Sequence, residues 1–96
     1  MTDKITIVHL LKNEKNRLTN EFGVRQIGLF GSYSRNEANG NSDIDLLVDM
    51  APDFSKLTLL QINLEQLLHA HVQLTRVGPH LSETFLKRIA QDIIYV

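Results

Sequence analysis

Two carboxylates and a glycine–serine pair are the residues of this 96-residue chain whose spacing could support chemistry. Asp43 and Asp45 are two residues apart in a predicted strand, so both side chains leave the same face of that strand. Gly31 and Ser32 follow the preceding predicted strand, and free backbone amides at the start of a helical turn favour phosphate oxygens. Paired carboxylates on a rigid strand suit Mg²⁺ bridging to the oxygens of a triphosphate.

Each of these features has an ordinary explanation when it stands alone. Most Asp-x-Asp pairs are solvated or cap loops, and a Gly-Ser pair after a strand is a common turn. In this chain, however, the two features bracket one short polar segment, and the remainder of the second strand is almost wholly apolar. Neighbouring acids repel each other unless a cation or hydrogen-bond donors compensate them. The combination therefore predicts a site for a metal ion and phosphate.

The same residues resemble a known signature. Gly31-Ser32, ten further residues and then Asp43-Ile44-Asp45 are similar to the motif of the DNA polymerase beta-like nucleotidyltransferase superfamily. Arg35 and the run from Ser42 to Val48 narrow the resemblance to the minimal nucleotidyltransferases, which are stand-alone domains of about this length. The resemblance implies a small mixed β-sheet flanked by helices, an α/β (α+β) fold like the palm of polymerase beta.

The resemblance also assigns expected roles to individual residues. Gly31 and Ser32 would hold the nucleotide phosphates, with Ser42 as a further nucleotide-binding residue, and Asp43 and Asp45 would bind Mg²⁺. Arg35 would support the turn or neutralise phosphate, although an exposed ion pair is an equally good explanation. Asn36 stands where relatives have glycine, which is a mild change because asparagine tolerates left-handed backbone angles.

One residue departs from the family pattern. The superfamily places a third carboxylate on the strand after the long helix, and Gln73 occupies that position here. Glutamine is neutral and cannot act as a base, although its amide oxygen can still approach a cation. His71 shares the predicted face of Gln73, but a histidine at the end of a sheet is a more common situation than a base. Asp49 is expected to be a solvated acid at the end of its strand.

Two functions follow from the resemblance. Minimal nucleotidyltransferases often pair with a HEPN-domain toxin, and the chain would then be an antitoxin that uses Mg-ATP to transfer AMP to a hydroxyl, such as a tyrosine of the toxin. The alternative is a catalytically degenerate module that acts by forming a complex, and Gln73 favours it. A subunit whose partner completes the substrate site is a third reading.

The predicted element order is α-β-α-β-α-β-α, in two or three layers. The expected elements are a helix over 3–20, a strand over 25–30, a short helix or turn over 32–38, a strand over 43–50, a helix over 54–69, a strand over 71–77 and a helix over 82–92. Thr2 or Asp3 can cap the first helix, Ser82 can cap the last one, and the apolar tail can pack back on the domain.

Helical spacing predicts the buried faces of the two long helices. The expected stripes are Ile5, Val8, Leu11 and Leu18 in the first helix, and Leu57, Leu60, Leu64, Leu67 and Leu68 in the second. Leu59 and Ile62 lie off the second stripe. They indicate either a helix buried on two sides or a surface for a protein partner.

Composition limits the remaining possibilities. The formal net charge is −1, which does not favour extended nucleic-acid binding. The chain has no cysteine, no signal-peptide pattern at its start and no apolar stretch long enough to cross a bilayer. We therefore expect a single domain over 1–96, a cytoplasmic location, no membrane contact, and a HEPN-type protein and a nucleoside triphosphate as partners. A homo-oligomer is compatible with the sequence.

Overall fold

The computed structural model describes residues 3–96 and contains three long or medium helices and a mixed sheet. The elements are α1 (Lys4–Phe22), β1 (Gln26–Phe30), β2 (Ile44–Asp49), α2 (Phe54–Leu68), β3 (Val72–Arg76), α3 (Glu83–Ala90) and β4 (Ile94–Tyr95). None of the helices within the described range combines the length and apolar character that a membrane crossing requires.

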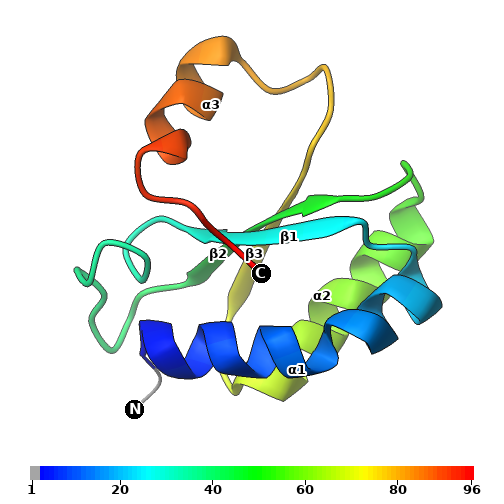
Figure 1. The fold of residues 1–96 in the computed structure, drawn as a ribbon, viewed down its shortest axis with the longest axis horizontal. Coiled ribbons are helices and arrows are strands. Elements are labelled where there is room, and N and C mark those ends of the chain that lie inside the picture. The colour runs from blue at the N-terminus through cyan, green and yellow to red at the C-terminus, as the bar shows by residue number, and fades with distance from the viewer. Residues whose placement is uncertain (1–2) are drawn as a thin grey trace.

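The sheet has the strand order β3-β2-β1-β4. β2 and β3 are parallel, because α2 carries the chain back between them, whereas β1 is antiparallel to both β2 and β4. Figure 1 shows α1 and α2 on one face of the sheet and α3 on the other. The expected small mixed sheet flanked by helices is therefore confirmed, and the layers number three.

The element order differs from the prediction in two places. Ser32–Asn36 form consecutive turns, the second of the two forms predicted for this segment, so they add no helix to the element order; Asn36 at their end has a left-handed φ of 58°. At the other end of the chain, the apolar tail does pack back as expected, but it does so as a strand. β4 pairs with β1 through Gly28 and Leu29, so the observed order is α-β-β-α-β-α-β.

Helix α1 is bounded by the residues that the sequence indicates. The Asp3 side chain accepts a hydrogen bond from the Thr6 amide at 2.9 Å, and Gly23 ends the helix with a left-handed φ of 70°. Thr2, the other expected cap, lies outside the described residues. The prediction that Ile5 is buried is wrong, since 77% of it is exposed, and Ile7 is buried instead. Two residues turn a helix by about 200°, so the two isoleucines face opposite sides.

The larger core lies between the sheet and the layer formed by α1 and α2. Helix α2 begins after Asp53, whose side chain accepts from the Lys56 amide, and it buries Leu60, Leu64 and Leu68. Along each strand, residues that face α1 and α2 alternate with residues that face α3. The strand residues on the side of α1 and α2 are Ile27, Leu29, Ile44, Leu46, Val48 and Val72.

The face of the sheet toward α3 is packed more sparingly. Phe30 and Leu47 form a second cluster with Ile89 of α3, and Phe85 packs edge-on against Phe30 with ring centroids 5.8 Å apart. The cap of α3 is Ser82, as predicted, and it accepts from the Phe85 amide at 3.1 Å. Because this cluster is small, much of the α3 face of the sheet remains available for polar side chains.

The burial of α2 generates a stability prediction. Leu64→Ala removes a fully buried side chain from the larger core and should lower the free energy of unfolding by about 2–5 kcal/mol, as measured by urea denaturation. Leu59→Ala is the matched control on the same helix, because 58% of Leu59 is exposed, and it should change stability by less than about 0.5 kcal/mol. Equal effects of the two substitutions would contradict the observed orientation of α2.

Candidate active site

The turn after β1 lies against the carboxylate of Asp45 in β2. Gly31 has a left-handed φ of 77°, and its carbonyl oxygen accepts hydrogen bonds from the Ser34 hydroxyl at 3.0 Å and the Arg35 amide at 3.2 Å. A Cβ at Gly31 would overlap the Oδ2 atom of Asp45. Glycine is therefore required twice at this position, for its backbone angle and for the close approach of the acid.

Strand pairing brings Gln73, which stands at the expected position of a third acid, next to Asp45. Asp45 is paired with Phe30 of β1 on one side and with Gln73 of β3 on the other. Since Ile44 and Leu46 are buried on the side of α1 and α2, the alternating residues Asp45 and Gln73 face α3. No cluster of three histidine, cysteine, aspartate or glutamate side chains suited to a metal occurs within residues 3–96.

The environment of Asp45 disfavours its negative charge. Burial of the carboxyl group raises its pKa above the ordinary value, and the nearby charge of Asp43 raises the pKa further, while Arg35 acts in the opposite direction. Two acids that repel in this way are stabilised by a compensating cation, by hydrogen-bond donors or by protonation of one of them. The two carboxylates, the neutral amide oxygen of Gln73 and the oxygens of a bound phosphate form a donor set of the kind that Mg²⁺ accepts.

A cleft of about 590 Å³ lies between the sheet and α3, and it contains Asp45 and Gln73. We call it the arginine cleft, because Arg35 and Arg88 both line it. Arg88 comes from α3 and lies 5.8 Å from the centre of the Phe85 ring, a cation–π contact that helps to position its guanidinium. Among the residues that the structure describes, Arg88 pairs with no carboxylate.

Arg35 makes exposed ion pairs and also lines the arginine cleft. Its Nε atom donates to Glu37 at 3.0 Å, and one of its terminal nitrogens lies 4.0 Å from the Asp92 carboxylate. The side chain nevertheless lines the arginine cleft and is close enough to Asp45 to lower the pKa of that acid. Arg35 is therefore an exposed ion-pair residue that also faces the cleft. Asn36 adopts a left-handed φ of 58°, an angle that asparagine tolerates.

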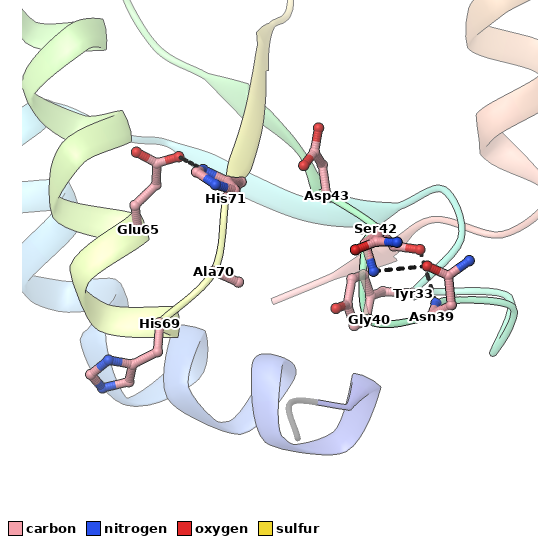
Figure 2. Close-up of a pocket in the computed structure, with 10 residues that line it drawn as sticks. Tyr33, Asn39, Gly40, Ser42, Asp43, Glu65, His69, Ala70 and His71 are labelled. Carbon is pink, nitrogen blue, oxygen red and sulfur yellow. Dashed lines mark hydrogen bonds and ion pairs between the residues drawn. The ribbon is translucent and has the colours of Figure 1, made fainter.

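Asp43 also borders a second cavity, although its side chain leaves the same face of β2 as that of Asp45. This second cleft has a volume of about 960 Å³, and we call it the Asp43 cleft. Figure 2 shows Asp43 between the loop that carries Asn39, Gly40 and Ser42 and the pair formed by Glu65 and His71. His71 Nδ1 lies 3.6 Å from Glu65 Oε2, and the same oxygen accepts from the Val72 amide at 3.0 Å.

Ser42 and Ser32 occupy structural positions in the two turns of the site. The Ser42 hydroxyl accepts from the Asn39 amide at 2.9 Å and closes the loop that precedes Asp43, so Ser42 lies at the Asp43 cleft. The carbonyl oxygen of Ser32 accepts from the Glu37 amide at 2.8 Å. Asp49, at the far end of β2, is paired with Arg25 at 2.9 Å and is therefore engaged away from the site.

Reasoning from the sequence missed Arg88 and Phe85 as residues of the cleft that contains Asp45. The available signal was the spacing within the last helix. Phe85, Arg88 and Ile89 follow the i, i+3, i+4 pattern of one helical face, so a buried Ile89 brings the other two toward the sheet. Which part of the sheet they would meet depends on the path of the turn after β3, which the spacing does not determine.

Comparison with known proteins agrees with the geometry. The family model described as polymerase beta, nucleotidyltransferase, matches residues 6–96. Protein adenylyltransferase MntA of Thermococcus cleftensis is 39% identical to this chain over 92 residues, which cover 94% of this chain and 92% of the relative.

Solved structures of similar proteins share the fold. A protein described as a minimal nucleotidyltransferase has a TM-score of 0.78 at 25% identity and covers 97% of this chain and 95% of its own. A toxin–antitoxin structure with AMP-PNP has a TM-score of 0.67 at 26% identity, and the match covers 98% of this chain and 72% of that one. A chain from the Shewanella oneidensis complex of a tri-AMPylated HEPN toxin with its MNT antitoxin has a TM-score of 0.62 at 24% identity. The match covers 91% of this chain and 69% of that one.

The raised pKa of Asp45, caused first by burial and then by the charge of Asp43, predicts how stability depends on pH. Because the pKa of Asp45 is raised on folding, ionised Asp45 destabilises the fold, and that cost grows as pH rises through its folded pKa. In metal-free buffer, Asp45→Asn should therefore unfold at a higher urea concentration than the unsubstituted protein at pH 7. The difference should shrink as pH falls below the ordinary carboxyl range.

Asp49→Asn is the matched control on the same strand. It breaks an exposed ion pair with Arg25 and should lower stability by no more than about 1 kcal/mol at pH 7. If Asp45→Asn unfolds at a lower urea concentration than the unsubstituted protein at pH 7, the negative charge of Asp45 is well compensated without a cation.

Proposed function

The chain belongs to the polymerase beta-like nucleotidyltransferase family, and from this premise we propose that it is a protein adenylyltransferase that acts as the antitoxin of a HEPN-type toxin. The observation that carries the proposal is the contact between the Gly31 turn and the Asp45 carboxylate, with Asp43 two residues away. This arrangement suits a nucleoside triphosphate and a divalent cation. The 39% identity to a protein adenylyltransferase favours ATP as donor and a protein as acceptor.

The arginine cleft is the better place for the triphosphate. Guanidinium groups bind phosphate oxygens with two parallel hydrogen bonds, and Arg88 has no carboxylate partner within residues 3–96 to compete. Arg35 approaches the same space from the turn. The amide of Ser32 can approach a phosphate oxygen closely because Gly31 lacks a side chain.

Asp43 and Asp45 would hold the metal ion. Mg²⁺ supplies charge stabilisation to phosphate oxygens when it is bound. The two carboxylates would hold the cation, and its charge would offset the burial and the Asp43 repulsion that raise the pKa of Asp45. Ser42 acts indirectly in this proposal, because its hydroxyl closes the loop that carries Asp43.

Gln73 makes a phenolic acceptor the most favourable one. A glutamine cannot take a proton from the attacking hydroxyl, so the acceptor must lose its proton with little help. The hydroxyl of tyrosine has a pKa of about 10 and is far more acidic than the alkyl hydroxyl of serine or threonine. We therefore propose tyrosine as the residue that receives AMP on the HEPN partner.

The second candidate function is complex formation without transfer. The observation that favours it is again Gln73, since the loss of a general base commonly costs about 10²-fold or more in rate. In that case Asp43, Asp45 and the Gly31 turn would still bind Mg-ATP, and the protein would neutralise its partner by binding alone. Transfer chemistry distinguishes the two functions directly.

A labelling experiment tests the leading proposal. The protein is incubated with a HEPN-type toxin, Mg²⁺ and ATP labelled at the α-phosphate, and the modified residue is found by mass spectrometry. We expect label on a tyrosine of the partner, with loss of at least about 10²-fold in rate for Asp43→Asn and little change for Asp49→Asn. A stable complex that carries no label would sink the transfer proposal in favour of binding alone.

Restoring the third acid provides a second test. Gln73→Asp places a carboxylate beside Asp45 and should raise the transfer rate by about 10²-fold, because it supplies the missing base. The unsubstituted protein should also respond more steeply than Gln73→Asp to acceptor acidity. The comparison uses a partner in which fluorotyrosine, with its lower pKa, replaces tyrosine. Identical dependence on acceptor acidity in both proteins would rule out a role of position 73 in deprotonation.

A further inference from the structure

Strand β3 forms a free edge of the sheet. The order β3-β2-β1-β4 leaves both β3 and β4 with a neighbouring strand on one side only. β4 is a strand of two residues, whereas β3 has five residues, Val72–Arg76, with no proline or glycine among them. Proteins normally shield the backbone groups of a long edge strand, because these groups can pair with a strand of another chain.

Alternate residues of β3 direct their backbone groups to the free edge. The carbonyl oxygen of His71 and the amide of Val77 both bond to β2, at 2.9 and 2.8 Å. In a ladder of paired strands every second residue bonds to the same neighbour. Val72, Leu74 and Arg76 therefore point their backbone N–H and C=O groups away from β2.

Of these three residues, Val72 is shielded by α2. The Val72 amide donates to Oε2 of Glu65 at 3.0 Å, and the Val72 carbonyl oxygen accepts from Nε2 of Gln61 at 3.1 Å. Within residues 3–96, the backbone N–H and C=O of Leu74 have no hydrogen-bond partner on this side. The sheet therefore ends in open donors and acceptors centred on Leu74.

Apolar side chains of α2 lie beside this edge. Gln61 and Glu65 reach β3, and Phe54 and Thr58 occupy the same side of α2 in its earlier turns. Phe54 is 85% exposed, and Ile62, next to this side of the helix, is 48% exposed. Large apolar side chains next to open backbone groups form a surface that a second polypeptide can cover.

The edge is complementary in charge to a second copy of itself. In an antiparallel pair of β3 strands centred on Leu74, Arg76 lies opposite Val72 of the second copy, on the face that α2 covers. Because Glu65 contacts Val72, the Arg76 guanidinium can reach Glu65 of the second copy. Arg76 has no carboxylate partner within the described chain. The two-fold symmetry of such a pair makes this contact twice.

The pairing also supplies a partner for each backbone group that it engages. Each Leu74 donates to and accepts from the Leu74 of the other copy. Where the Arg76 carbonyl oxygen takes the Val72 amide, Glu65 is released to the guanidinium of the same arginine. The ion pair therefore replaces the hydrogen bond that shields Val72 in the single chain.

The spacing of the two α2 helices fits the same arrangement. A helix that connects two adjacent parallel strands lies above them, so the α2 helices of the two copies would be separated by about twice the distance between strands, or ~10 Å. This is close to the 8–10 Å at which helices pack. Phe54 and Ile62 of each copy would then be covered by the antiparallel α2 helix of the other.

We propose that two copies of this chain form a two-fold dimer in which their β3 strands pair antiparallel through Leu74 and join the two sheets. On the face toward α3, Gln73 and Thr75 line the arginine cleft. The pairing places Thr75 of each copy opposite Gln73 of the other, so the two arginine clefts adjoin at the dimer axis. Gly31 and Asp45 lie on the far side of β2 from this axis and stay accessible.

A charge exchange tests the dimer by sedimentation equilibrium from about 10 μM to about 1 mM protein. The unsubstituted chain should associate to a dimer. Arg76→Glu and Glu65→Arg each place like charges opposite one another, and each should raise the dimer Kd by at least about tenfold. An equimolar mixture of these two variants restores both ion pairs and should form a heterodimer, which also shows that both variants fold.

The matched control is Lys12→Glu, an exposed charge reversal on α1 that should leave the dimer Kd within about twofold. A chain that stays monomeric at all these concentrations would overturn the proposal. A mixture of Arg76→Glu and Glu65→Arg that associates no more tightly than either variant alone would do the same.

Amide hydrogen exchange locates the contact on the strand. Exchange of the Leu74 amide should slow at least about tenfold as the protein concentration rises through the dimer Kd, because this amide is bonded only in the dimer. The Thr75 amide, which faces β2, should exchange slowly at every concentration. A dimer in which Leu74 exchanges as fast as in the monomer associates through another surface, and the proposal is then wrong. Protection of Leu74 that requires a HEPN-type toxin would assign the edge to that protein instead.

Discussion

The close approach of Gly31 to Asp45 is the constraint on which the site depends. A left-handed turn without a side chain lets the backbone after β1 meet the carboxylate of β2, and any Cβ at that position would collide with it. The antiparallel pairing of Phe30 with Asp45 sets this contact, and the parallel pairing of Asp45 with Gln73 adds β3. A phosphate that binds at the turn is therefore held directly beside the acid.

The rest of the fold supplies rigidity on one side of the sheet and access on the other. Alternation along each strand sends the apolar residues into the core beneath α1 and α2, and the same alternation sends Asp45 and Gln73 toward α3. The opposite layer is a single short helix over a small cluster around Ile89. Figure 1 shows α3 alone on this face of the sheet, and the cleft that contains Asp45 lies beneath it.

Local patterns in the sequence were sufficient for most of the fold. Residue spacing located the three helices and the caps Asp3 and Ser82, whereas the family resemblance placed Gln73 with Asp45, and the two residues are indeed paired in the sheet. The misses concern packing between distant segments. Ile5 was assigned to the wrong helical face, β4 depends on pairing with β1, and the place of Arg88 depends on the path between β3 and α3. Residues far apart in the chain determine these features, and no short window contains them.

The central claim is that Mg-ATP binds where the Gly31 turn meets the two carboxylates. The most direct measurement is a titration of the ¹⁵N-labelled protein with ATP, with and without Mg²⁺, followed by backbone chemical shifts. The account predicts Mg²⁺-dependent changes at Ser32, Asp43, Asp45 and Arg88, and much smaller changes at Asp49, which shares the strand but lies away from the site. Unchanged resonances at Ser32, Asp43 and Asp45 in the presence of Mg-ATP would contradict it.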